Sequence, residues 1–146
     1  MATVVLLVAV AAGLSACSSA TACTEVGCGS QVTFDLEYDL EAGDLYLVEV
    51  CVDDFCRTQT LEVPEDRDGA LPVTEVGDLG LQTDRDIIYL ALPDERDWSG
   101  THVATLAVRD AEGRVVSEHE GDVDFESVQP NGTNCPPVCW LAEVNA

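Results

Sequence analysis

The fold of this chain is decided by the ten-residue stretch QVTFDLEYDL (31–40), in which apolar and polar side chains alternate without interruption. This two-residue period is that of a β-strand, because successive side chains of a strand point to opposite faces. One face carries Val32, Phe34, Leu36, Tyr38 and Leu40, and the other carries Thr33, Asp35, Glu37 and Asp39. A strand with one apolar and one acidic face indicates an antiparallel sheet that covers a core on one side and meets water on the other.

The residues that follow predict a β-hairpin closed by a disulfide. The turn EAGD (41–44) leads into a strand over 45–52, and a two-residue turn at Asp53 and Asp54 would place Cys51 directly opposite Cys56. The Cα atoms of a non-hydrogen-bonded pair approach closely enough for such a bridge. Aspartate adopts positive φ less freely than glycine, so we expect the disulfide to support this turn, although so short a loop contributes little stability.

Further short strands are predicted along the rest of the chain. The partner strand of the hairpin covers 57–63, and the remaining strands are expected at 73–76, 87–92, 101–109, 114–118 and 121–128. The run IIYLAL (87–92) is continuously apolar, which is typical of a strand covered on both faces. A rigid tail is expected over 135–140. Seven or eight strands without a helical period predict an all-β, disulfide-stapled antiparallel β-sandwich of immunoglobulin-like kind; the alternative is a small β-barrel.

One hairpin supports this fold class by resemblance. The segment LAVRDAEGRVV (106–116) resembles a hairpin of bacterial immunoglobulin-like and related sandwich domains, with the pattern L-x-V-x-D-x-x-G-x-V-V. The resemblance implies a sandwich and carries no function.

The first 16 residues are predicted to be a signal peptide. The apolar run 4–14 has eleven residues, whereas a helix that spans a bilayer needs about 20. The sequence LSAC (14–17) resembles the lipobox of bacterial lipoproteins, which implies cleavage before Cys17, a diacylglyceryl thioether on its sulfur, and a place on the extracytoplasmic side of the cell membrane. The start MAT (1–3) departs from that family because it lacks Lys and Arg. The alternative is an ordinary secretory signal with Cys17 in a disulfide. Residues 17–22 would form a tether and residues 23–146 one domain.

The other six cysteines predict three disulfides in an oxidising compartment. They form closely spaced couples: Cys23 with Cys28, Cys51 with Cys56, and Cys135 with Cys139. We favour pairing within each couple, and the alternative cross-links the two ends of the domain. The gaps are too wide for Cys-x2-Cys zinc knuckles, so no metal site is expected at these thiols. The segments CTEVGC (23–28) and CPPVCW (135–140) are similar to those of small secreted lipoproteins of high-GC bacteria, a resemblance that implies no activity.

The charge of the chain limits its partners. With 28 acidic and six basic residues the formal net charge is −22, a surface that repels nucleic acid and anionic lipid headgroups. We expect the membrane to be contacted only through the lipid anchor, no cofactor, and a monomeric domain. The acidic faces at 35–39 and 122–126 would share a divalent cation such as Ca2+ if their strands were neighbours; the alternative is two solvated strand faces.

The residues favour binding over catalysis. The chain has His102 and His119, no Lys and no Gly-x-Ser-x-Gly motif, so we predict that it is not an enzyme, with a hydrolase as the remote alternative. Trp98 lies in a charged loop, where we expect it to cap the core rather than to stack on a sugar. The prediction is a lipid-anchored surface binding or adhesion module with an unknown protein or cell-wall ligand on the loops at one end of the sandwich. The alternative is a structural or accessory envelope protein without a ligand.

Overall fold

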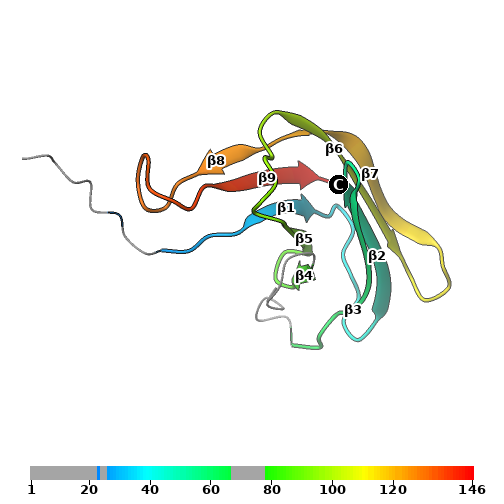
Figure 1. Ribbon diagram of the computed structural model, residues 1–146. Coiled ribbons are helices and arrows are strands. Elements are labelled where there is room, and N and C mark those ends of the chain that lie inside the picture. Colours follow the sequence, from blue (N-terminus) through cyan, green and yellow to red (C-terminus); the bar gives the residue numbers. More distant parts are fainter. Residues whose placement is uncertain (1–22, 24–25, 67–77) are drawn as a thin grey trace, which may run out of the picture.

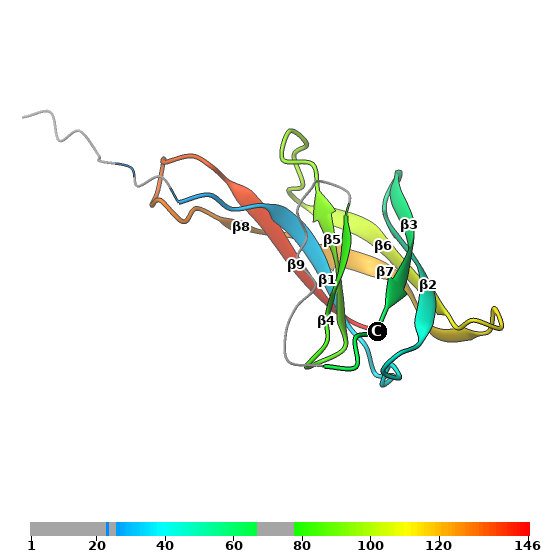
Figure 2. The same cartoon turned by 90° about the horizontal axis from the view of Figure 1, so that it is seen from below.

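Two β-sheets pack face to face in the computed structural model, which describes residues 23, 26–66 and 78–146 (Figures 1 and 2). The strands are β1 (Ser30–Asp35), β2 (Leu45–Val52), β3 (Phe55–Glu62), β4 (Leu79–Gln82), β5 (Ile87–Leu92), β6 (Thr101–Arg109), β7 (Val115–Asp124), β8 (Glu126–Val128) and β9 (Cys139–Asn145). One sheet has the order β4-β5-β1-β9-β8 and the other β3-β2-β6-β7. The predicted β-sandwich is therefore confirmed over the described ranges, where no closed barrel forms.

Some predictions concern segments outside the described residues. These are the signal peptide over 1–16, the tether over 17–22 with Cys17, and the strand expected at 73–76. Within the described part of the chain, no helix is long and apolar enough to cross a membrane.

The core forms because the inward positions of both sheets are apolar. From the four-stranded sheet, β2 contributes Val48, Val50 and Val52, each at most 1% exposed. From the five-stranded sheet, β1 contributes Val32 and Phe34, which are fully buried. Each such side chain stabilises the fold by about 1.5–3 kcal/mol through burial of apolar surface.

The first strand is shorter than its alternating pattern predicts. β1 ends at Asp35, although Leu36 and Leu40 remain buried. The backbone N–H of Leu36 donates to the carbonyl of Asp86 at 3.2 Å, and the chain then crosses the end of the sandwich toward β2. Tyr38 was expected on the apolar face and is instead 37% exposed, because the strand geometry does not continue to that position.

The C-terminal segment differs most from the expected fold. A rigid tail was predicted over 135–140, whereas β9 begins at Cys139 and lies between β1 and β8 inside the five-stranded sheet. β9 runs parallel to β1, with Gln31 opposite Leu141 and Phe34 opposite Val144. The described chain therefore has nine strands rather than seven or eight. The two strands expected at 114–118 and 121–128 are also rearranged, because β7 is continuous to Asp124 and β8 belongs to the other sheet.

The two terminal cysteine couples cross-link the ends of the domain, so the predicted local pairs Cys23–Cys28 and Cys135–Cys139 are wrong. Cys23 is joined to Cys135 with a Cα–Cα distance of 5.5 Å, and Cys28 to Cys139 with 6.1 Å. The reason is the parallel pairing of β1 and β9, since the segments that precede two parallel strands enter the sheet at the same end. The bridge between Cys51 and Cys56 is confirmed, with a Cα–Cα distance of 4.0 Å and the predicted register.

A polar contact reinforces the same end of the sheet. The side-chain amide of Asn131 accepts a hydrogen bond from the backbone N–H of Val26 at 2.9 Å and donates to its carbonyl at 3.0 Å. Asn131 also donates to the carbonyl of Pro136 at 2.7 Å. The side chain of Asn131 thus holds the N-terminal segment to the C-terminal one, in addition to the two disulfides.

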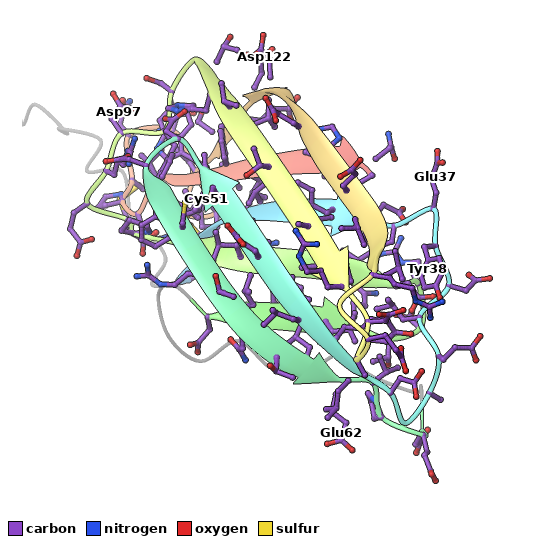
Figure 3. All side chains as sticks on the ribbon, turned by 90° about the vertical axis from the view of Figure 1, so that its right-hand side faces the viewer. Glu37, Tyr38, Cys51, Glu62, Asp97 and Asp122 are labelled. Carbon is purple, nitrogen blue, oxygen red and sulfur yellow. A yellow bond between two sulfur atoms is a disulfide. The ribbon has the colours of Figure 1, made fainter. Side chains whose placement is uncertain are left out.

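The two acidic faces do not meet. Asp35 lies on β1 in the five-stranded sheet, whereas Asp122 and Asp124 lie on β7 in the four-stranded sheet. Figure 3, which views the four-stranded sheet from outside, shows Asp122 and Glu37 well separated. The premise of a cation shared by neighbouring strands is therefore wrong. Among the described residues, no group of three or more His, Cys, Asp or Glu is placed to hold a metal ion.

We expect loss of the second terminal disulfide to lower the free energy of unfolding by more than loss of the first. With one bridge kept, the second closes only a short ring, so Cys28→Ser with Cys139→Ser should lower the free energy of unfolding by roughly 3 kcal/mol. Removing the remaining bridge, which closes a loop with a sequence separation of 112, should cost roughly 5 kcal/mol more. Urea denaturation of the two variants measures this. Equal losses at the two steps would contradict the cross-linked arrangement, as would non-reducing peptide maps with Cys23 joined to Cys28.

Candidate functional site

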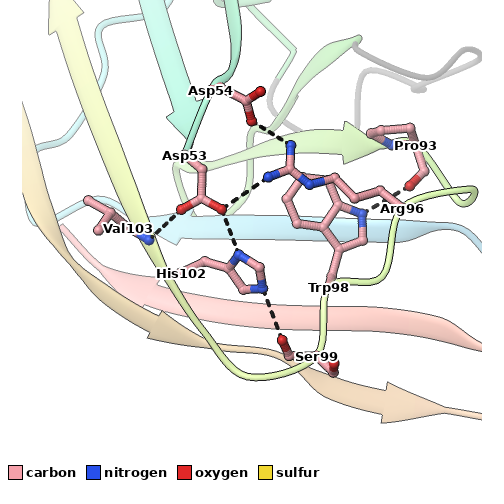
Figure 4. A network of polar contacts seen from close by, with 8 residues as sticks. All are labelled: Asp53, Asp54, Pro93, Arg96, Trp98, Ser99, His102 and Val103. Atoms are coloured by element: carbon pink, nitrogen blue, oxygen red, sulfur yellow. Dashed lines mark hydrogen bonds and ion pairs between the residues drawn. The ribbon is translucent and has the colours of Figure 1, made fainter.

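One end of the sandwich carries a polar network over a buried tryptophan (Figure 4). The loop between β5 and β6 folds back so that Trp98 is fully buried and its Nε1–H donates to the carbonyl of Pro93 at 2.9 Å. The guanidinium of Arg96 lies 4.4 Å from the centroid of the Trp98 ring, and Phe55 meets that ring edge-on at 6.4 Å. Trp98 therefore caps the core, as predicted, and offers no exposed face for a ligand.

Asp53 is the centre of this network. Its carboxylate accepts hydrogen bonds from the backbone N–H of Val103 at 3.0 Å, from His102 Nδ1 at 2.7 Å and from Arg96 Nη2 at 3.2 Å. Its backbone has a φ of 52°, which is unfavourable for a residue other than glycine. The hairpin turn is thus held by these contacts in addition to the adjacent disulfide, a support that the sequence analysis did not identify.

The network also changes the titration of its carboxylates. The hydrogen bond from His102, followed by that from the Val103 N–H, lowers the pKa of Asp53 below its usual range. The hydrogen bond from Arg96 likewise lowers the pKa of the exposed neighbour Asp54, with an Nη1 to Oδ1 distance of 2.6 Å. Both carboxylates are therefore ionised at neutral pH, and each has a cationic partner.

Neither histidine is arranged as a general base. His102 faces Asp53 through Nδ1, and its Nε2 is 3.3 Å from the backbone carbonyl of Ser99, so both ring nitrogens are engaged and Ser99 does not present its hydroxyl. His119 points into the sandwich, where its ring meets Phe34 edge-on at 6.1 Å. Its Nε2 is buried, with no hydrogen-bond partner among the described residues. His119 also borders a depression on the four-stranded sheet, between Glu118 and Glu120 in the sequence.

The outer face of the five-stranded sheet provides a different kind of site. A depression of about 530 Å³ lies over β1, β5 and β9 and the turn between β4 and β5. Its lining includes Gln31, Thr33, Asp35, Gln82, Arg85, Tyr89 and Glu143. Apart from Arg85, which lies in the turn between β4 and β5, these are outward positions of strands whose alternate residues form the core, so a rigid scaffold places them.

The register sets these side chains in rows across the strands. One row contains Gly80 on β4, Tyr89 on β5, Thr33 on β1 and Glu143 on β9. The next row contains Gln82, Ile87, Asp35 and Asn145 from the same strands. Directly opposed residues of neighbouring strands have Cβ atoms about 5 Å apart. The two rows therefore place an aromatic ring beside amide, hydroxyl and carboxylate groups.

Tyr89 lies flat on the sheet. A Cβ atom placed on Gly80 would lie 2.2 Å from Cζ of Tyr89, and 2.5 and 2.6 Å from its Cε2 and Oη. Because Cζ is nearer than the two atoms bonded to it, the added Cβ would point at the ring face rather than at the ring edge. One face of the ring covers the glycine backbone, and Tyr89 also lines the depression. Alanine at position 80 would therefore displace the Tyr89 ring.

A second depression, of about 590 Å³, lies on the outer face of the four-stranded sheet. Its charged lining consists of Glu49, Glu118 and Glu120 with Arg109, and it includes no Tyr, Phe or Trp. Solvated carboxylates on an exposed strand face are expected for a chain of this net charge. The depression beside Tyr89 is therefore the candidate functional site.

This site was not predicted from the sequence. Ligand contacts were expected on the loops, and the strand at 87–92 was expected to be covered on both faces. That second prediction is wrong, because Tyr89 and Ala91 are only half-buried and face outward. A tyrosine in an apolar run is the one signal that could have indicated an open face, since its hydroxyl favours contact with water.

Comparisons with protein-family models, with curated proteins and with solved structures found no match.

The role of Asp53 can be tested by removing its charge. Asp53→Asn keeps an acceptor for the Val103 N–H and a residue that tolerates positive φ, but weakens the contacts to His102 and Arg96. We expect the melting temperature at pH 7 to fall by about 4 °C. The control Asp54→Asn changes a carboxylate that is 85% exposed, and it should lower the melting temperature by less.

The lowered pKa of Asp53 predicts that the effect of Asp53→Asn on stability depends on pH. The pKa of Asp53 is lowered in the folded state, so its contribution to stability is present above the unfolded pKa and is lost as the pH falls through the folded pKa. The difference in melting temperature between the parent protein and Asp53→Asn should therefore persist at pH 5 and shrink below about pH 4. A difference that grows on acidification would contradict this assignment.

Proposed function

We propose that this protein is an exported, lipid-anchored component of the cell envelope whose sandwich domain binds a ligand without catalysing a reaction. The observation that carries the proposal is the use of the cysteines. The chain has seven, and six of them are joined in the three disulfides of the described residues. The one left over is Cys17, which occupies the lipidated position of the lipobox resemblance. Three disulfides are typical of an oxidising compartment outside the cytoplasm.

The position of the bridges supports this anchoring. The first bridged residue, Cys23, follows Cys17 by only a few residues and is joined to Cys135, while Cys28 is joined to the first residue of β9. A lipid on Cys17 would thus be connected covalently to two strands at the centre of the five-stranded sheet. The bridges would also keep β9 next to the anchored segment if β1 frayed.

Binding without catalysis is favoured by the contrast between the two candidate regions. The network around Asp53 and His102 is internally satisfied and covers the core. The outer face of the five-stranded sheet instead presents polar side chains and Tyr89 around a depression. With a net charge of −22, the domain disfavours nucleic acid and other polyanions as ligands.

Lipidation is tested by Cys17→Ala in cells that export the protein. The variant should lack the thioether, so it should be released into the medium or remain as an uncleaved precursor, whereas the parent protein should enter the detergent phase of a Triton X-114 extract. Ser19→Ala, a change of similar size beyond the lipobox, should remain anchored. Cys17→Ala protein that is still processed and still partitions with detergent would overturn the proposal.

A further inference from the structure

We propose that the free edge of β7 binds an extended, positively charged segment of a partner protein, which adds to the four-stranded sheet as a further strand. The inference goes beyond the proposed function, because this edge belongs to the other sheet from the depression beside Tyr89. It is carried by the unpaired backbone of β7, by the carboxylates that alternate along it, and by the contrast with the opposite edge of the same sheet.

β7 is an edge strand, and among the described residues only β6 pairs with it. The order of its sheet is β3-β2-β6-β7, which leaves the second side of β7 without a neighbouring strand. β7 has ten residues, and Figures 1 and 3 show it at the border of its sheet. An edge of this length presents a row of backbone donors and acceptors with which an extended peptide can pair.

The register identifies the backbone groups that face this edge. The N–H of Val103 on β6 donates to the carboxylate of Asp53 at 3.0 Å, and its carbonyl accepts from the Asp53 N–H at 2.9 Å. The backbone groups of Val103 therefore point away from β7. Its antiparallel partner Asp122 must then point its own N–H and C=O away from β6, toward the free edge. The register continues without a break, so the same holds at every second residue, at Glu120 and Glu118.

The residues with edge-facing backbone groups also carry acidic side chains. Glu118, Glu120 and Asp122 are exposed and alternate with half-buried residues, so their carboxylates lie on the outer face of the sheet. Within the described ranges, no ion pair involves any of these three carboxylates. A strand added at this edge would place every second side chain opposite one of them, with Cα atoms about 5.5 Å apart. Lysine or arginine at those positions would be attracted to the carboxylates.

The opposite edge of the same sheet differs. The outward positions of β3 are those opposite the outward residues of β2, namely Cys56, Thr58, Thr60 and Glu62. They include one carboxylate, and Cys56 is bridged to Cys51. Figure 3 shows Glu62 and Asp122 at opposite borders of the sheet. The alternating carboxylates of β7 are therefore not an even distribution of the net charge of −22 over both edges.

Charge selects a basic partner rather than a second copy of this chain. Two β7 edges paired with each other would bring the carboxylates of both copies together, and each chain has a formal net charge of −22. Charged side chains on an edge strand thus oppose self-association. The same charges attract a cationic segment, and the field of an acidic domain speeds its encounter with such a partner.

The experiment uses the domain with its disulfides intact, labelled with 15N, and an octapeptide in which lysine alternates with threonine. Without peptide, the edge-facing amides of Glu118, Glu120 and Asp122 should exchange with solvent quickly, whereas those of His119 and Gly121, which face β6, should exchange slowly. Saturating peptide should slow exchange at the three edge amides about tenfold or more, and added NaCl should weaken binding. Absence of saturable binding at millimolar peptide, or protection of β3 in place of β7, would overturn the proposal.

Matched peptides separate strand pairing from attraction by charge alone. One has the same sequence with alternate backbone amides N-methylated, so that it keeps its charge but cannot pair with the edge. The other has glutamate in place of lysine. We expect both to bind about tenfold more weakly or not at all. Equal binding of the N-methylated peptide would overturn the added strand. Edge amides that are protected without peptide, together with a dimer in analytical ultracentrifugation, would assign the edge to a second copy and contradict the basic partner.

Variants test the carboxylates and the backbone of the edge. Glu118→Gln with Glu120→Gln should weaken peptide binding about tenfold at low salt. The control Glu62→Gln with Glu95→Gln makes the same change in net charge on β3 and in the β5–β6 loop, and it should weaken binding by less. Equal effects of the two double variants would contradict the edge assignment.

Glu120→Pro removes an N–H from the free side of an edge strand, a position at which proline is tolerated, so it should abolish binding and leave the circular dichroism spectrum unchanged. A folded Glu120→Pro variant that binds as the parent protein does would refute strand pairing. If this variant fails to fold, the N-methylated peptide decides the same question. None of these measurements depends on the lipid at Cys17, which detergent partitioning tests separately.

Discussion

The parallel pairing of β1 with β9 is the constraint on which the rest of the domain depends. It places the first and last strands side by side at the centre of the five-stranded sheet, with β5 on one flank and β8 on the other. Parallel pairing of β1 with β9 costs conformational entropy, because it closes most of the chain into a loop. The bridges Cys23–Cys135 and Cys28–Cys139 reduce that entropy cost, because they restrict the conformations of the unfolded chain. Asn131 adds hydrogen bonds at the same place. The outer face that holds the depression exists only because these strands meet.

The same end of the sandwich has a second, non-covalent support. Ser30 of β1 lies opposite Leu92 of β5, so the loop that follows β5 is next to the bridged segments. Closure there also depends on Trp98, on the cation over its ring and on the carboxylate of Asp53. Asp53 joins the β2–β3 turn to the start of β6, so a residue with unfavourable φ is held by three hydrogen-bond donors. The disulfides and the polar network therefore hold one end of the domain together. The groups of the network are satisfied among themselves, which is why ligand binding is assigned to the outer face of the five-stranded sheet.

The sequence was sufficient to predict the sandwich and the central hairpin, since alternation over 31–40 and the spacing of Cys51 and Cys56 are local signals. It was insufficient where the answer depends on which strands become neighbours. The pairing of the terminal cysteines follows from β1 and β9 running parallel, and no local pattern specifies that. The strand β9 was missed because Pro136 and Pro137 precede it and its alternation is only seven residues long. The contact of Tyr89 with Gly80 was missed for a similar reason, because the two residues become partners only through the β4–β5 register.

The functional proposals depend on one claim: six cysteines are bridged within the domain and the seventh carries the lipid. The intact mass of the mature protein, purified from membranes without reduction, tests this claim most directly. We expect a chain that begins at Cys17, carries the added mass of a diacylglyceryl group, and contains no free thiol. A mass that corresponds to an unmodified chain, to cleavage elsewhere, or to protein with free thiols would contradict it.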